Sequence, residues 1–137
     1  MILFDTNVWS VLRKPDGQEL AATWISERME QAWLSVIAIA EIRAGIENPD
    51  AAQKKDMLEH WLEDLEIICS DRILDFDVRS AHIFGSLVAR RKLQKQETKL
   101  LDIQLAAQAI AHGCPVATRN VRDFEWTGAT VVNPWAA

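Results

Sequence analysis

Four acidic side chains spread along the chain are the residues best suited to chemistry: Asp5, Glu41, Asp102 and Asp123. If the fold brings them together, three carboxylates within about 5 Å would repel by roughly 3 kcal/mol per pair at an effective dielectric of about 20. Such a cluster must bind a cation or take up protons. Because all the candidate ligands are oxygen atoms, the expected ion is the hard cation Mg²⁺, or Mn²⁺, rather than Zn²⁺.

Each acid also has a purely structural interpretation. Asp5 ends an apolar run and precedes residues that favour a turn, so it could simply cap a helix. Glu41 shares a predicted helix face with small residues, which leave room for an ion or substrate, but it could also be an exposed glutamate paired with an arginine. Asp102 opens an alanine-rich segment, where a carboxylate stabilises a helix N-terminus through the helix dipole.

A second polar group follows a late apolar segment, residues 115–118. Asn120 is neutral, so it can ligate a cation or form hydrogen bonds but cannot act as a base. Asp123 follows three residues later. Either residue could complete a site built on the other three acids.

The elements that must position these residues alternate between strands and helices. That alternation predicts an α/β fold with a parallel sheet covered on both faces. Ligands bind such sheets at the carboxyl ends of the strands, where Asp5 and the 119–123 segment lie. The predicted strands are 2–4, 73–76 and 115–118, and the predicted helices start after Asp5 and span 19–31, 35–46, 51–68, 78–96 and 102–112.

Composition bounds the protein class. A chain of 137 residues with 49% hydrophobic and 26% charged residues predicts one globular domain, residues 1–137. No apolar run is long enough to cross a membrane and no secretory signal is evident, so we expect a cytoplasmic protein. Cys69 and Cys114 have no metal-ligand spacing and are expected to be reduced, buried thiols.

A net charge of −5 argues against broad nucleic-acid affinity, but the cations are unevenly distributed. Arg90, Arg91, Lys92, Lys95 and Lys99 lie within ten residues that lead toward Asp102. They predict a track for phosphates, with Arg90 and Arg91 as the first substrate contacts to test. The alternative is a solvated helix end stabilised by the dipole.

The acidic segments together resemble the PIN-domain nucleases, and among them the VapC-type toxins of bacterial toxin-antitoxin pairs. The matching motifs are Asp5-Thr6-Asn7, Ala40-Glu41-Ile42-Arg43-x-Gly45, Asp102-x-x-Leu105-Ala106-Ala107 and Thr118-Arg119-Asn120-x-x-Asp123-Phe124, in order and over nearly the whole chain. The ending Val132-Asn133-Pro134-Trp135 is similar to the FitB-like branch. One departure is Asn120, where many members of the family carry an aspartate.

The resemblance implies a three-layer α/β/α fold with about five strands and a metal-dependent ribonuclease. Asp5 and Asp102 would be the principal metal ligands, Glu41 a ligand or the group that orients the attacking water, and Asn120 or Asp123 would complete the site. The hydroxyls of Thr6 and Thr118 could contact a phosphate. The resemblance further implies a small antitoxin that blocks the site, a homodimer, and operator DNA bound only through the antitoxin.

Two other functions compete with this interpretation. Phosphatases and phosphoacceptor proteins also place an aspartate and Mg²⁺ at a strand end, but the phosphatase signature needs a second aspartate where this chain has Asn7. A PIN-like module that binds RNA or protein without cutting is the second rival, suggested by Asn120.

Overall fold

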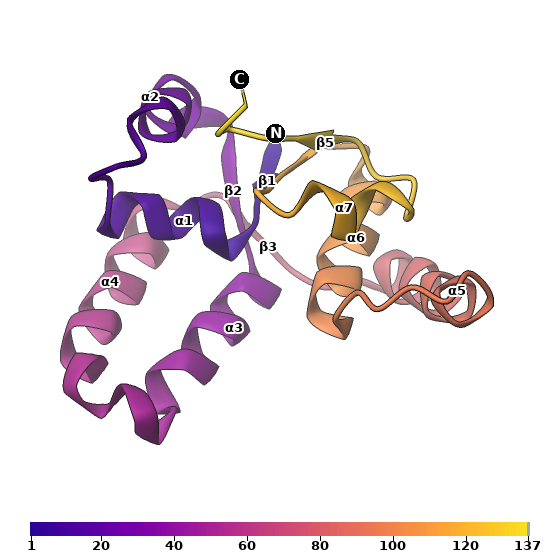
Figure 1. Ribbon diagram of the computed structural model, residues 1–137, viewed down its shortest axis with the longest axis horizontal. Coiled ribbons are helices and arrows are strands. Elements are labelled where there is room, and N and C mark those ends of the chain that lie inside the picture. The colour runs from indigo at the N-terminus through magenta and orange to yellow at the C-terminus, as the bar shows by residue number, and fades with distance from the viewer. Residues whose placement is uncertain (137) are drawn as a thin grey trace.

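The computed structural model describes residues 1–136 and builds them around a five-stranded sheet with the order β3-β2-β1-β4-β5 (Figure 1). Every neighbouring pair of strands is parallel. The strands are β1 (Ile2–Phe4), β2 (Ala32–Ser35), β3 (Ile73–Leu74), β4 (Val116–Ala117) and β5 (Val131–Val132). The parallel sheet predicted from the alternation of strands and helices is therefore confirmed, and so are the five strands that the PIN-domain resemblance implies.

Side chains alternate across the sheet because successive residues of a strand point to opposite faces. In β1, Ile2 and Phe4 join one apolar core, whereas Leu3 joins the other. In β4 the same division separates Ala117 from Val116. Both faces of the sheet are buried, as expected for parallel strands that are continuously apolar.

Helices cover both faces and complete the three layers predicted (Figure 1). Residues of the first four α-helices build the core that contains Phe4, and residues of the last three build the core that contains Leu3. The first group is α1 (Thr6–Arg13), α2 (Glu19–Arg28), α3 (Val36–Glu47) and α4 (Lys55–Ile68), and the second is α5 (Val78–Leu93), α6 (Leu100–His112) and α7 (Val121–Glu125).

Several predicted boundaries differ from the structure. The predicted helices 19–31 and 51–68 are each divided into an α-helix and a 3₁₀ turn, at Met29–Gln31 and Pro49–Lys54. Helix α5 ends at Leu93 rather than at residue 96, and Lys95 adopts a positive φ of 53° that cannot continue a helix. Strands β2 and β5 and helix α7 were not predicted.

The strand order reverses beside β1, which pairs with β2 on one side and with β4 on the other. Such a switch point leaves a crevice at the carboxyl ends of the strands, where ligands bind in open α/β sheets. Asp5 follows β1 and Thr118 follows β4, so both lie at this crevice. No helix within residues 1–136 is long and apolar enough to cross a bilayer.

Candidate active site

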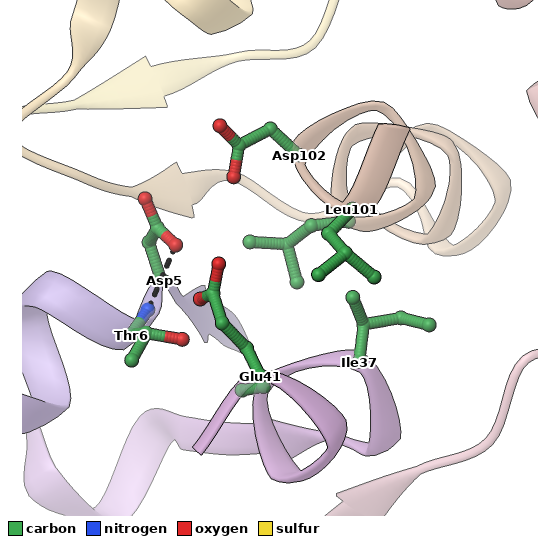
Figure 2. Close-up of a pocket in the computed structure, with 8 residues that line it drawn as sticks. Asp5, Thr6, Ile37, Glu41, Leu101 and Asp102 are labelled. Atoms are coloured by element: carbon green, nitrogen blue, oxygen red, sulfur yellow. Dashed lines mark hydrogen bonds between the residues drawn. The ribbon is translucent and has the colours of Figure 1, made fainter. Parts of the chain in front are cut away.

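Three acids from three separate elements line one narrow pocket at the switch point. Asp5 is the N-cap of α1, Glu41 lies within α3, and Asp102 lies in the first turn of α6. Figure 2 shows their carboxyl groups turned toward one another across the pocket. The remaining lining residues are Thr6, Ile37, Ala38, Leu101 and Leu105. The mostly apolar lining lowers the local dielectric and strengthens the electrostatic interactions among the acids.

Hydrogen bonds hold Asp5 in a single orientation. One carboxylate oxygen accepts from the Thr6 backbone N–H at 2.8 Å, the contact dashed in Figure 2. The other accepts from Thr118 Oγ1 at 2.7 Å and from Asn7 Nδ2 at 3.2 Å. Asp5 is only 4% exposed, so these bonds replace most of its solvation. Asp5 therefore caps the helix, as its structural interpretation predicts, and also lines the pocket, while its role as a metal ligand stays a prediction.

The acids perturb one another electrostatically. Burial raises the pKa of Asp5, the hydrogen bonds from Thr118 and Thr6 lower it, and the charges of Glu41 and Asp123 raise it. Burial raises the pKa of Asp102 to about 7, and the charges of Asp5, Glu41 and Asp123 add to the rise. Strongly perturbed acids in a cleft are typical of functional sites.

Of the late polar residues, Asn120 is the N-cap residue of helix α7 and Asp123 lies within that helix. Asp123 is close enough for its charge to raise the pKa of both Asp5 and Asp102. Asn120 is exposed and contributes its backbone N–H, which donates to Thr118 Oγ1 at 3.0 Å. The structure thus brings Asp123 into the electrostatic field of the acids, whereas Asn120 supports Thr118 through its main chain.

The pocket suits a hard cation in its chemistry. Its charged groups are all carboxylates, and their mutual repulsion would be relieved by a cation. The Thr6 hydroxyl in the pocket wall is buried and lacks a hydrogen-bond partner, so it is available to form a hydrogen bond with a bound ligand. Across residues 1–136, however, no three acidic, histidine or cysteine side chains lie close enough to form a finished metal-binding cluster.

The two arginines predicted to contact substrate are engaged with the main chain. Arg90 Nη1 donates to the Thr127 carbonyl at 3.3 Å, and Arg91 Nη1 donates to the Thr98 carbonyl at 2.9 Å. The exposed cations Lys95 and Arg122 instead line a polar pocket of about 310 Å³ that also contains Asp123. Lys99, the N-cap residue of α6, lies close enough to lower the pKa of Asp102.

Two residues near the acids were missed as site residues. Asn7 Nδ2 donates to Asp5, and Asn7 Oδ1 accepts from the Arg119 backbone N–H at 3.2 Å, so this amide connects the ends of β1 and β4. Its position two residues after Asp5 was a usable signal. Thr98 is 4% exposed, donates to the Asp123 carbonyl at 3.1 Å and accepts from Trp126 Nε1 at 2.7 Å. No local pattern marks Thr98.

Comparison with known proteins agrees with this fold. The family described as PIN domain matches residues 2–127. VapC ribonuclease Y4jK from Sinorhizobium fredii is 35% identical, with 98% of each chain covered. Toxin FitB from Neisseria gonorrhoeae is 34% identical over 98% of this chain and 99% of its own.

A solved structure has the same fold. FitAcB from Neisseria gonorrhoeae has a TM-score of 0.85 and 34% identity, with both chains fully covered. The chain belongs to the PIN-domain family, and its full-length relatives include proteins of the VapC and FitB kinds.

Proposed function

We propose that the protein is a Mg²⁺- or Mn²⁺-dependent endoribonuclease and the toxin of a toxin-antitoxin pair. The observation that carries this proposal is the convergence of Asp5, Glu41 and Asp102 on one pocket at the switch point of the sheet. Full-length relatives named as a VapC ribonuclease and as toxin FitB support the reaction class and the toxin role.

Asp5 and Asp102 would be the principal metal ligands, because both face the same pocket. Burial first, and then the charges of neighbouring acids, raise the pKa of each carboxyl group, and a bound cation would offset both effects. Glu41 would be a further ligand or would orient the attacking water by accepting its hydrogen bond. Asp123 would add negative charge at the pocket mouth. A bound divalent cation would polarise the phosphoryl oxygen and screen the charge that develops on it.

Thr118 and Asn7 would act on Asp5 rather than on the substrate. Both donate to the same carboxylate oxygen, which restricts rotation of the carboxyl group and favours its charged form. The free Thr6 hydroxyl faces the pocket and is the better candidate for a direct contact with a phosphate or an ordered water.

Beyond the three acids, the bound RNA strand would continue across the polar pocket that is lined by Lys95, Arg122 and Asp123. Each phosphate contact made there should contribute about 0.7 to the slope of log affinity against log salt. Replacing Arg90 and Arg91 by alanine should weaken RNA binding and flatten that slope. Lys95→Ala and Arg122→Ala test the same track without removing the carbonyl contacts that Arg90 and Arg91 make. If the slope of log affinity against log salt is unchanged in all four variants, these cations do not form a track for phosphates.

The proposed partner is a small antitoxin that occupies the acidic pocket. A negatively charged pocket on a chain of net charge −5 favours a basic segment as that occupant. Contact with operator DNA would be made by the antitoxin, and the toxin would form a homodimer. Sedimentation of the purified toxin at several concentrations tests the dimer.

The deciding experiment is cleavage of end-labelled RNA by purified, antitoxin-free protein with Mg²⁺, Mn²⁺ or EDTA. Asp5→Asn should remain folded and lose the metal-dependent cleavage, whereas Asp16→Asn, the same change in an exposed loop, should retain it. Absence of cleavage by folded wild-type protein with either metal would instead favour a PIN-like module that binds without cutting.

A further inference from the structure

Gln108 is a fully buried polar residue of α6 to which the proposed chemistry assigns no role. Its side chain is 0% exposed. Nε2 donates to the Leu74 carbonyl at 3.3 Å and to the Asp75 carbonyl at 3.1 Å, and Oε1 accepts from Ser35 Oγ. Because carbonyls only accept and the amide oxygen only accepts, this set of partners fixes which way the amide points.

Ser35 connects Gln108 to the helix that carries Glu41. It ends β2 and is the N-cap of α3, where its Oγ accepts from the Ile37 backbone N–H at 2.9 Å. Its hydroxyl proton is donated to Gln108. The Ser35 hydroxyl and the Gln108 amide thus join the start of α3, the interior of α6 and the end of β3. The hydroxyl proton of Ser35 and Nε2 of Gln108 both donate hydrogen bonds.

The two acids lie at equal distances along their helices from this connection. Glu41 is six residues after Ser35, and Asp102 is six residues before Gln108. Six helical residues span about 9 Å, so a 5° rotation of either helix about the connection would displace its carboxylate by roughly 0.8 Å. Displacements near 1 Å are enough to reduce catalysis strongly.

We propose that Ser35 and Gln108 form a positioning pair, which sets the separation of the Glu41 and Asp102 carboxylates by holding α3 against α6. Neither residue lines the acidic pocket, so both act through the helices that they connect. Apolar packing alone would hold the helices together but is not directional. The three hydrogen bonds that Gln108 makes, in contrast, are directional and restrict tilting of α6 relative to α3 at this connection. The inference rests on the proposed function for its kinetic readout.

The test compares Gln108→Leu, Ser35→Ala and the double variant with wild type, far below the temperature at which any of them unfolds. The kcat for RNA cleavage should fall at least about tenfold while KM changes less than about twofold. The Mn²⁺ dissociation constant, measured by calorimetry without RNA, should rise. Because the pair acts as a unit, the double variant should lose little more than the worse single variant.

Control variants separate positioning from stability. Gln104→Leu makes the same chemical change on the same helix, outside the pocket lining, and Leu87→Ala removes buried volume from the core on that face of the sheet. Both should leave kcat and Mn²⁺ affinity unchanged, although Leu87→Ala should lower Tm. Ser35→Thr keeps the hydroxyl and should retain activity better than Ser35→Ala.

Folded Gln108→Leu with wild-type kcat and wild-type Mn²⁺ affinity would overturn the inference, and so would strictly additive losses in the double variant. The calorimetric readout also distinguishes it from the proposed function. If wild type binds Mn²⁺ but does not cleave RNA, and Gln108→Leu binds the ion more weakly, positioning stands and the proposed reaction fails. Wild type that neither cleaves RNA nor binds Mn²⁺ would overturn both.

Discussion

Replacing Asp102 by asparagine should stabilise the metal-free protein at alkaline pH, although it removes a proposed metal ligand. The folded protein raises the pKa of Asp102 from 3.8 to about 7, first through burial and then through the charges of Asp5 and Glu41. In the folded state the group therefore keeps its proton at pH values where the unfolded chain has already lost it. An asparagine carries no charge to bury at any pH.

The sign of the effect follows from proton linkage. Between about pH 4 and pH 7 the folded state binds more protons than the unfolded state, so the stability that this group contributes decreases as pH rises. That stability is fully present below the unfolded pKa and is lost once pH exceeds the folded pKa. The destabilisation by Asp102 should therefore be near zero at pH 4 and complete at pH 8.

The magnitude can be bounded from the shift. A rise from 3.8 to about 7 corresponds to at most about 4 kcal/mol at 1.36 kcal/mol per unit. Asp102 is only partly buried, and solvent screening reduces this to about 2 kcal/mol. The carboxylate also stabilises the N-terminus of α6 by about 0.5 kcal/mol, which asparagine loses. The expected gain at pH 8 is about 1.5 kcal/mol.

The assay is urea unfolding in EDTA at pH 4 and pH 8, comparing Asp102→Asn with wild type. Asp56→Asn makes the same change in the exposed first turn of α4 and controls for the helix dipole, so it should produce no gain at pH 8. Equal differences in unfolding free energy at the two pH values, or a less stable Asp102→Asn protein at pH 8, would refute the raised pKa of Asp102 and with it the burial and charge repulsion inferred for this carboxyl group.

Three further outcomes are expected. Thr118→Val removes the hydroxyl that donates to Asp5 at 2.7 Å, so urea unfolding at pH 8 should show a loss of about 1–2 kcal/mol; an unchanged midpoint would mean that this bond contributes nothing. Gly113 ends α6 with a φ of +62°, so Gly113→Ala should lower the free energy of unfolding by about 1 kcal/mol. Gly85 lies on α5 with open space where a Cβ would be added, so Gly85→Ala should raise the free energy of unfolding, and changes of the same sign in the two variants would contradict this reasoning. Mg²⁺ should raise the wild-type Tm at pH 8 and EDTA should reverse the rise, and loss of that response in Asp5→Asn would tie it to the pocket.

Local patterns in the sequence predicted the parallel α/β fold and the positions of the three pocket acids. Asp5 follows an apolar strand and Asp102 opens a helix, and both signals lie within a few residues of the acid itself. The carboxyl ends of neighbouring parallel strands meet at one edge of a sheet, which predicts a site beside Asp5. The convergence of Glu41 and Asp102 on that site was expected only on condition that the chain adopts the α/β fold. The roles of the individual acids in catalysis remain predictions.

Only the tertiary structure revealed which polar groups support those acids. Ser35 and Gln108 are 73 residues apart, and neither lies in a pattern that predicts a shared hydrogen bond. The hydrogen bond from Arg91 to the Thr98 carbonyl was likewise not predicted from the sequence, and the phosphate contact proposed for Arg91 stays a prediction. Hydrophobic periodicity records which side of an element is buried, and it carries no information about which buried polar groups meet across elements. Those partners depend on how the helices pack on the sheet, and packing is decided by the whole chain.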